Sequence, residues 1–176
     1  NQTRALDGLQ AQPAMVEVHV ANGLPAFSLV GLADAEVREA RDRVRAALLS
    51  SGFEFPARRI TVNLAPADLP KDSGRFDLPI ALGLLAASGQ LPALNLGNYE
   101  FAGELSLTGS LRPVRGALAL ALASHHADHT LILPEASGAE AALAEGASIR
   151  IAGNLREVCA HLMGEDQLPT PQKPDL

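Results

Sequence analysis

One short stretch of the sequence gathers the residue types that most often do chemistry. Residues 65–74 are predicted to form a loop, because two prolines and a glycine interrupt any regular structure there. This stretch and the helix start after it supply three carboxylates, a lysine and a serine: Asp68, Asp72, Asp77, Lys71 and Ser73. Carboxylates can hold Mg²⁺, and a serine beside a lysine is the pair that some hydrolases use. We favour the plainer interpretation, in which Asp77 caps a helix and the others are solvated turn residues.

A stripe of arginines is the second candidate. Arg38, Arg41 and Arg45 are spaced by three and four residues, so they share one face of the helix predicted over residues 35–50. Two interpretations stay open at this point. The stripe is either a solvated face paired with the carboxylates beside it, or a basic surface for a polyanion or an acidic neighbour.

Histidines and the single cysteine are weaker candidates. His125 and His129 are four residues apart and would share a helix face with His126 between them, as in part of a zinc site. Too few carboxylates or cysteines stand nearby to complete such a site, so we favour a polar helix end and predict no metal. Cys159 falls on the apolar side of the last predicted helix, which favours buried packing over a nucleophilic role.

Composition limits the class of protein. The chain has 176 residues, of which 47% are hydrophobic but only 3% aromatic, so Ala, Leu, Val and Ile must build the core. A formal charge of −6 argues against a surface that binds nucleic acid everywhere. One cysteine excludes an internal disulfide and suggests a reducing compartment, hence the cytoplasm. We find no signal peptide, no membrane-spanning run and no Walker A motif, so we expect no ATP hydrolysis by these residues.

Sequence periodicity predicts a mixed α/β fold. Strands are expected over residues 4–10, 15–20, 26–30, 59–64, 99–103 (continued by 104–107), 111–112, 130–133 and 148–152. Helices are expected over residues 35–50, 77–88, 114–125, 137–144 and 154–163, with Asp34, Asp77, Ser137 and Asn154 as N-caps. Asn22 and Gly23 form a turn signal, which predicts that the strands on either side pair as a hairpin. Residues 1–163 would form one domain with a mixed sheet, and the proline-rich residues 164–176 a linker.

Three phrases in the sequence are long enough to support a family resemblance. GLPAFSLVGL, SGFEFPARRITVNLAPADLPK and FDLPIAL resemble the opening domain of the magnesium-chelatase-related, competence-associated AAA+ proteins, the ComM/YifB family, over residues 4–163. The resemblance implies that an AAA+ ATPase module using ATP and Mg²⁺ follows in the parent protein. It further implies a hexameric ring that binds single-stranded and branched DNA and drives branch migration during natural transformation.

That opening domain is in turn similar to the proteolytic domain of Lon, a ribosomal-protein-S5-domain-2-like α/β fold. Lon-type peptidases carry a PKDGPSAG-like run with the nucleophilic serine, and this chain has PKDSGRFD over residues 70–77, which puts Arg75 at the serine position. The activating lysine position falls on Leu118, within GELSLTGSLRPVRGALAL. Arginine cannot act as the nucleophile and leucine cannot act as the base, and Ser73 is displaced by two residues. We therefore expect the fold without the peptidase activity, and no cofactor in this chain.

Two functions remain as hypotheses for a non-catalytic domain of this kind. In the leading one, the domain contacts single-stranded or branched DNA through basic residues, and the scarcity of aromatic residues predicts binding to the backbone rather than base stacking. The candidate contacts are Arg38, Arg41, Arg45, Arg58, Arg59, Lys71, Arg75, Arg112 and Arg115. In the alternative, the domain is a structural oligomerisation module with no DNA contact.

Overall fold

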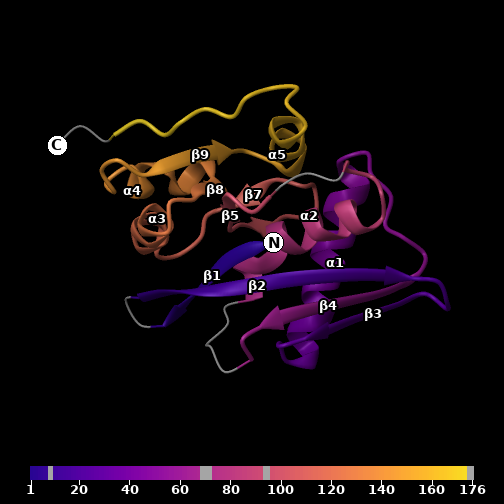
Figure 1. The fold of residues 1–176 in the computed structure, drawn as a ribbon. Coiled ribbons are helices and arrows are strands. Elements are labelled where there is room, and N and C mark those ends of the chain that lie inside the picture. The colour runs from indigo at the N-terminus through magenta and orange to yellow at the C-terminus, as the bar shows by residue number, and fades with distance from the viewer. Residues whose placement is uncertain (8–9, 68–72, 93–95, 174–176) are drawn as a thin grey trace.

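The chain folds as two sheets and a small hairpin with helices between and around them (Figure 1). The computed structural model describes residues 1–7, 10–67, 73–92 and 96–173. Among these, the strands are β1 (Gln2–Asp7), β2 (Gln10–Ala21), β3 (Ala26–Val30), β4 (Arg59–Ala65), β5 (Tyr99–Phe101), β6 (Glu104–Leu105), β7 (Leu111–Arg112), β8 (Thr130–Pro134) and β9 (Ser148–Ala152). The helices are α1 (Asp34–Ser50), α2 (Asp77–Ala87), α3 (Ala117–His126), α4 (Gly138–Ala141) and α5 (Leu155–Leu162). The predicted mixed α/β class is confirmed, and the arrangement is consistent with an S5-domain-2-like fold.

The first sheet has the strand order β1-β2-β4-β3, with β2 antiparallel to β1 and β4, and β3 parallel to β4. The predicted hairpin between β2 and β3 is wrong, because β4 lies between them. Val62 of β4 is opposite Val18 on one side and Leu29 on the other. A turn signal depends only on the residues next to it and does not determine which strands pair. The position beside β2 is occupied by β4, whose alternate residues, such as Ile60, are fully buried.

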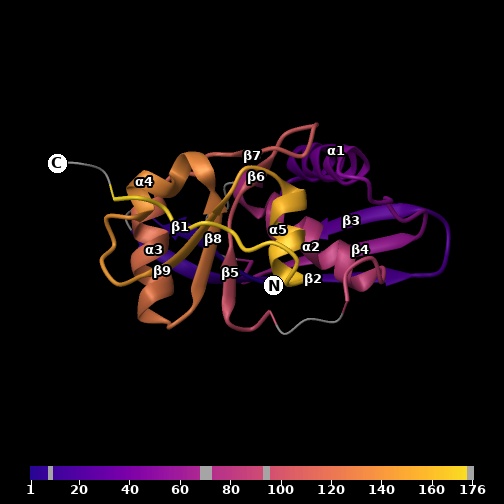
Figure 2. The same ribbon diagram turned by 90° about the horizontal axis from the view of Figure 1, so that it is seen from above.

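Helix α2 lies between the first sheet and the second, as both ribbon views show (Figures 1 and 2). Eight of its 11 residues are buried, so it is apolar on nearly every side rather than amphipathic. Helix α1 packs beside it through Ala40, Val44, Ala47 and Leu48. The opposite face of the first sheet is uncovered, because its alternate residues are exposed.

The second sheet is parallel, with the order β5-β8-β9, and β6 pairs with β7 as a separate hairpin. A second apolar cluster forms between this sheet and α3 and α4, and includes Leu120, Leu131 and Ile149. Helix α3 begins at Ala117, later than predicted, because Gly116 adopts a left-handed conformation with φ 73° that no helix continues through.

The predicted helix caps give a mixed outcome. Asn154 is confirmed, because its Oδ1 accepts a hydrogen bond of 2.9 Å from the Glu157 amide. The N-caps of α1 and α2 are Ala33 and Phe76 rather than the predicted Asp34 and Asp77, and Ser137 makes no side-chain cap bond, so those three predictions are wrong. Helices α1 and α2 begin at the aspartates themselves, so these residues lie within the first turn. The hydroxyl of Ser137 instead accepts a hydrogen bond of 3.0 Å from the Val114 amide.

Part of the predicted linker packs against the second sheet. Leu168 is buried, and its carbonyl accepts a hydrogen bond of 2.7 Å from Arg150 Nη1. The Pro169 carbonyl accepts from the Ile151 amide of β9. The domain boundary at residue 163 stays a prediction, but these contacts hold residues 168–169 on the domain. Within the described ranges, no helix combines the length and apolarity needed to cross a bilayer.

Candidate nucleic-acid interface

Helix α1 presents its predicted arginine stripe next to its buried face. Arg38 and Arg45 are exposed and Arg41 is half-buried, while Val44 and Leu48 face the core. Arg41 forms an exposed ion pair of 3.3 Å with the neighbouring Asp42, which contributes little because both groups are solvated. The stripe therefore remains accessible to a polyanion.

Arg41 and Arg45 line a pocket of about 360 Å³ together with Arg58, from the segment that leads into β4. The pocket lies between α1, the start of β3 and the residues before β4. Its lining is Pro25, Ala26, Phe27, Arg41, Arg45, Phe55, Pro56, Ala57 and Arg58. We call this pocket the arginine groove. Its described lining holds three guanidinium groups and no carboxylate, so it is an electropositive depression with a partly apolar wall.

The other predicted basic residues do not converge on the arginine groove. Arg59 alternates with the buried Ile60, so it points to the uncovered face of the first sheet while its neighbour Arg58 lines the groove. Arg112 and Arg115 are exposed on β7 and before α3. Lys71, with Asp68 and Asp72, lies outside the described residues, so their predicted roles stay predictions.

Arg75 is placed inside the fold rather than on its surface. Its side chain is 2% exposed, and Nη2 donates a hydrogen bond of 3.0 Å to the carbonyl of Arg115. The Arg75 carbonyl in turn accepts from the Gly103 amide. In this conformation Arg75 joins three segments of the chain and presents no surface to a nucleic acid.

Arg43, which was not among the predicted site residues, forms an ion pair with a buried carboxylate. Its guanidinium makes two bonds to Asp77, with Nε 2.7 Å from Oδ2 and Nη2 3.1 Å from Oδ1. Asp77 Oδ2 also accepts from the Leu105 amide at 3.0 Å. Burial raises the pKa of Asp77 to about 6, even though Arg43 and the Leu105 amide favour its ionised form.

A signal for this pair was present in the sequence. Arg43 is three residues after Ala40 and four before Ala47, both on the buried face of α1, so it borders the apolar stripe rather than the exposed one. Asp77 stands between Phe76 and Leu78 in an almost wholly apolar run. A charge at the edge of a core and a charge within an apolar segment are candidates to pair.

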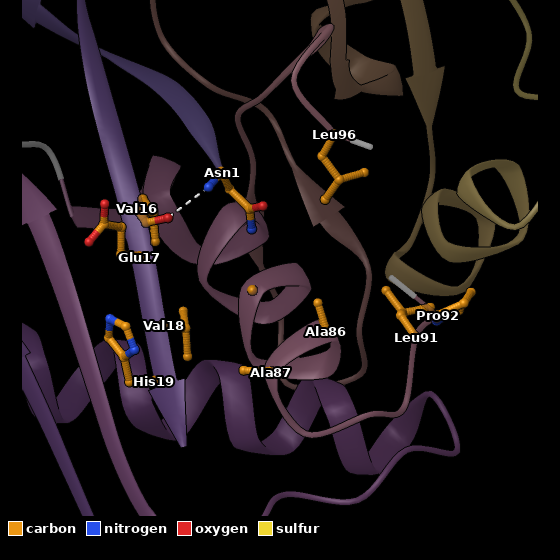
Figure 3. A pocket seen from close by; sticks show the side chains of 11 residues that line it. Asn1, Val16, Glu17, Val18, His19, Ala86, Ala87, Leu91, Pro92 and Leu96 are labelled. Atoms are coloured by element: carbon orange, nitrogen blue, oxygen red, sulfur yellow. Dashed lines mark hydrogen bonds between the residues drawn. The ribbon is translucent and has the colours of Figure 1, made fainter. Parts of the chain in front are cut away.

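A larger cavity, of about 580 Å³, lies between β2 and α2 (Figure 3). Val18, Ala86, Leu91 and Leu96 give it an apolar lining. The side chains of Glu17 and His19 belong to the same strand but lie on the side of β2 away from α2. Asn1 also lines the cavity, but its amino group and its amide donate to the carbonyls of Val16 and Pro79, at 2.8 and 2.7 Å. The described lining that faces α2 is otherwise apolar, so it does not resemble a catalytic or anion-binding site.

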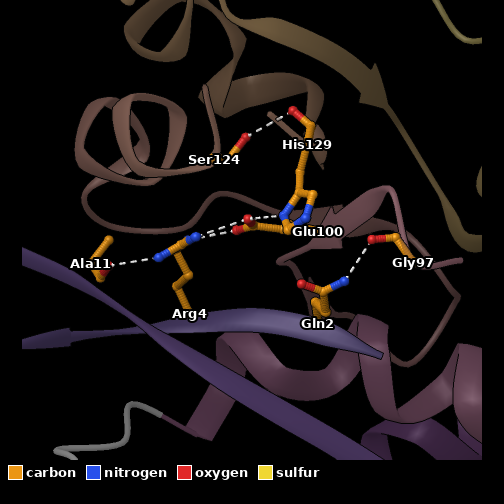
Figure 4. A network of polar contacts seen from close by, with 7 residues as sticks. All are labelled: Gln2, Arg4, Ala11, Gly97, Glu100, Ser124 and His129. Atoms are coloured by element: carbon orange, nitrogen blue, oxygen red, sulfur yellow. Dashed lines mark hydrogen bonds and ion pairs between the residues drawn. The ribbon is translucent and has the colours of Figure 1, made fainter. Parts of the chain in front are cut away.

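A buried polar network joins the two sheets (Figure 4). Glu100 of β5 is 2% exposed and accepts two bonds from Arg4 of β1, at 2.6 and 3.0 Å. His129 Nδ1 lies 2.7 Å from the same carboxylate. Thus His129 is committed to a structural contact, and no group of three potential metal ligands occurs among the described residues.

The single cysteine is part of the core. Cys159 of α5 is buried in the core, and burial raises the pKa of its thiol to about 12. A thiol that stays protonated is a poor nucleophile, so this position supports the packing role predicted for it.

Comparison with known proteins identifies the family. A family model described as subunit ChlI of Mg-chelatase matches residues 16–137, from β2 to the turn before α4. The chain belongs to the ChlI family. Uncharacterized protein YifB of Salmonella typhimurium is 51% identical over 174 residues, covering 99% of this chain and 34% of that protein. Competence protein ComM of Haemophilus influenzae is 50% identical over 167 residues, covering 95% of this chain and 33% of that protein.

These matches confirm the resemblance to the ComM/YifB proteins. The ChlI-family chain spans about a third of the length of the curated relatives it matches. Activities that belong to the whole relatives are therefore not properties of this chain by similarity alone.

In this ChlI-family chain, Arg75 and Leu118, which the resemblance to Lon puts at the dyad positions, lie in segments that contact each other. The Arg75 side chain bonds to the carbonyl of Arg115, just before α3, and Leu118 is in the first turn of that helix. The Leu118 amide donates to Glu140 Oε2 at 2.7 Å. A guanidinium that stays protonated and an aliphatic side chain cannot form a nucleophile and its base.

Proposed function

We propose that this chain is a non-catalytic domain that contacts DNA through the arginine groove. The observation that supports the proposal is the convergence of Arg41, Arg45 and Arg58 from two segments on one pocket whose described lining holds no carboxylate. Guanidinium groups bind phosphate oxygens bidentately, and each phosphate neutralised releases condensed counterions. Arg38 lies about one turn before Arg41 on the same stripe and extends the basic surface.

The relatives support a setting for this contact. One of them is named a competence protein, so we place the parent protein of this chain in DNA uptake and natural transformation. In that setting the parent is a cytoplasmic AAA+ ATPase that uses ATP and Mg²⁺, assembles as a hexamer and drives branch migration. The present chain would supply a contact to single-stranded or branched DNA rather than the motor.

The test is fluorescence-anisotropy binding of the 176-residue chain to labelled single-stranded and forked DNA across a salt series. We expect binding that weakens steeply with salt, and a slope of log K against log salt that falls by about one for each phosphate contact removed. Arg45→Ala and Arg58→Ala should each reduce the affinity and the slope for every sequence alike.

Arg59→Ala is the matched control for Arg58→Ala. The two arginines are neighbours in sequence and both are exposed, but Arg59 faces the uncovered side of the sheet. Equal losses from Arg58→Ala and Arg59→Ala would show that general charge, not the arginine groove, drives binding. If the chain binds no DNA at low salt, the proposal that this domain contacts DNA is wrong.

A second candidate function is assembly with other copies, and exposed apolar side chains favour it. Leu49 of α1 is 51% exposed and Leu107 is 61% exposed. The two lie close together, because the hydroxyl of Ser50 donates to the Leu107 carbonyl at 3.0 Å. If this surface joins copies, Leu49→Ser with Leu107→Ser should lower the mass measured by sedimentation equilibrium while DNA binding by the monomer persists.

A further inference from the structure

One wall of the arginine groove is aromatic. Phe27 comes from β3 and Phe55 from the segment before β4, and their ring centroids are 6.3 Å apart with the planes tilted by 32°. At that distance the rings contact each other, so no planar group fits between them. Both rings are half-buried and both line the groove, and Pro25 and Pro56 extend the same wall. The groove therefore offers one continuous apolar surface beside its charges.

The charged part of the groove is arranged along α1. Arg41 and Arg45 are four residues apart, which places them about 6 Å apart along the helix axis, and Arg58 reaches the pocket from the other segment. This spacing lets the guanidinium groups share one phosphate or contact two in succession. A volume of about 360 Å³ lies within the range of pockets that hold small organic groups.

We propose that the arginine groove is a subsite for one unpaired nucleotide. The base packs against the wall formed by Phe27 and Phe55, and the flanking phosphate is held by Arg41, Arg45 and Arg58. A base in a duplex is stacked between its neighbours and cannot enter the pocket, so the subsite favours single strands. This inference rests on the proposed function and adds to it a binding surface for an unpaired base, formed by Phe27 and Phe55.

The proposed subsite departs from one expectation that composition gave. A low aromatic content predicted binding to the backbone without stacking, yet two of the five phenylalanines of the chain line the arginine groove. Stacking on an aromatic side chain needs no hydrogen-bond pattern, so the subsite accepts any base.

The experiment compares a labelled oligothymidine with an abasic oligonucleotide of the same length, which keeps every phosphate but has no bases. Anisotropy titrations use the wild-type chain, Phe55→Leu and Phe53→Leu. Phe53 is a matched control, because it is half-buried in the same segment but does not line the groove. We expect about tenfold weaker binding of the abasic strand by the wild type, the range seen when one base–aromatic contact is lost.

Phe55→Leu should lose the preference for oligothymidine over the abasic strand. It should bind both strands with the affinity that the wild type has for the abasic strand, whereas Phe53→Leu should keep the preference. Equal binding of the two strands by the wild type overturns the subsite but leaves phosphate contact intact. Binding of neither strand overturns the proposed function itself. Poly-glutamate is a further ligand to compare. If it binds more tightly than either strand and Phe55→Leu weakens that binding, the groove is assigned to an acidic peptide and the subsite is overturned.

Discussion

Arg43 and Asp77 form a two-pronged ion pair that joins α1 to the first residue of α2. The Nε–Oδ2 distance is 2.7 Å and the Nη2–Oδ1 distance is 3.1 Å. The Asp77 side chain is fully buried, and that of Arg43 is 18% exposed. The same carboxylate accepts from the Leu105 amide of β6, so one side chain ties three elements together at the start of the central helix.

Removing the arginine of this pair should destabilise the chain strongly. Arg43→Ala leaves the Asp77 carboxylate buried with only the Leu105 amide as a partner, and breaking a buried pair in this way costs about 3–5 kcal/mol. Urea unfolding monitored by circular dichroism measures the free energy. Arg45→Ala, two residues away on the exposed stripe, should change it by less than about 0.5 kcal/mol. A loss in Arg43→Ala no larger than in this control contradicts the assignment.

The pH dependence of stability should carry a component from Asp77. The pKa of Asp77 is raised to about 6 in the fold from 3.8, so between these values the folded state binds more protons than the unfolded state. The contribution of Asp77 is therefore fully present below about pH 4 and is lost as the pH rises through about 6. Asp77→Asn cannot titrate and should lack this component.

The measurement is the unfolding free energy of wild type and Asp77→Asn at several pH values. The wild-type value minus the variant value should decrease by about 2 kcal/mol between pH 4 and pH 7. An increase over the same range would mean that Arg43, rather than burial, dominates the titration of Asp77.

The buried Glu100 should be intolerant of losing Arg4. Arg4→Met keeps the apolar stem but removes two hydrogen bonds to a carboxylate that is 2% exposed, leaving His129 as its partner (Figure 4). We expect a loss of about 3 kcal/mol, measured by thermal and urea unfolding. Gln2→Ala removes a nearby but exposed bond to the Gly97 carbonyl and should be nearly neutral. Comparable losses in both variants would place the cost in β1 generally rather than in the network.

Asn154, the N-cap of α5, should contribute to the free energy of unfolding through a single hydrogen bond. Asn154→Ala removes the acceptor for the Glu157 amide at 2.9 Å and should cost about 1 kcal/mol. Asn154→Asp retains an acceptor oxygen at the same place and should restore most of the stability. If Asn154→Asp unfolds as readily as Asn154→Ala, the contribution comes from packing and not from the cap.

Much of the local structure follows from the order of residues alone. Alternating apolar residues in β2 and β4 and the three-and-four spacing in α1 predict the elements, because which face a side chain occupies is a short-range property of the backbone. The Asn154 cap was predictable for the same reason, since its partner is three residues away. Family membership also followed from contiguous runs of sequence.

Pairing between distant residues was not predictable in this way. Asp77 was expected to cap its own helix, but its carboxylate is used by Arg43, which is 34 residues earlier. The Asn22–Gly23 signal suggested a hairpin, but β4 occupies the place between the two strands. In both cases the free energy gained when separate elements bury their apolar faces together exceeds a local preference of about 1 kcal/mol.

The candidate site shows the same division. The sequence by itself determined that Arg41 and Arg45 share a helix face. Only the tertiary structure decided that Arg58 joins them while Arg59 faces away, that Arg75 is buried, and that two phenylalanines form the wall of the same groove. The physical reason is that helix and strand periodicity acts over a few residues, whereas a binding surface is made where separate elements pack together.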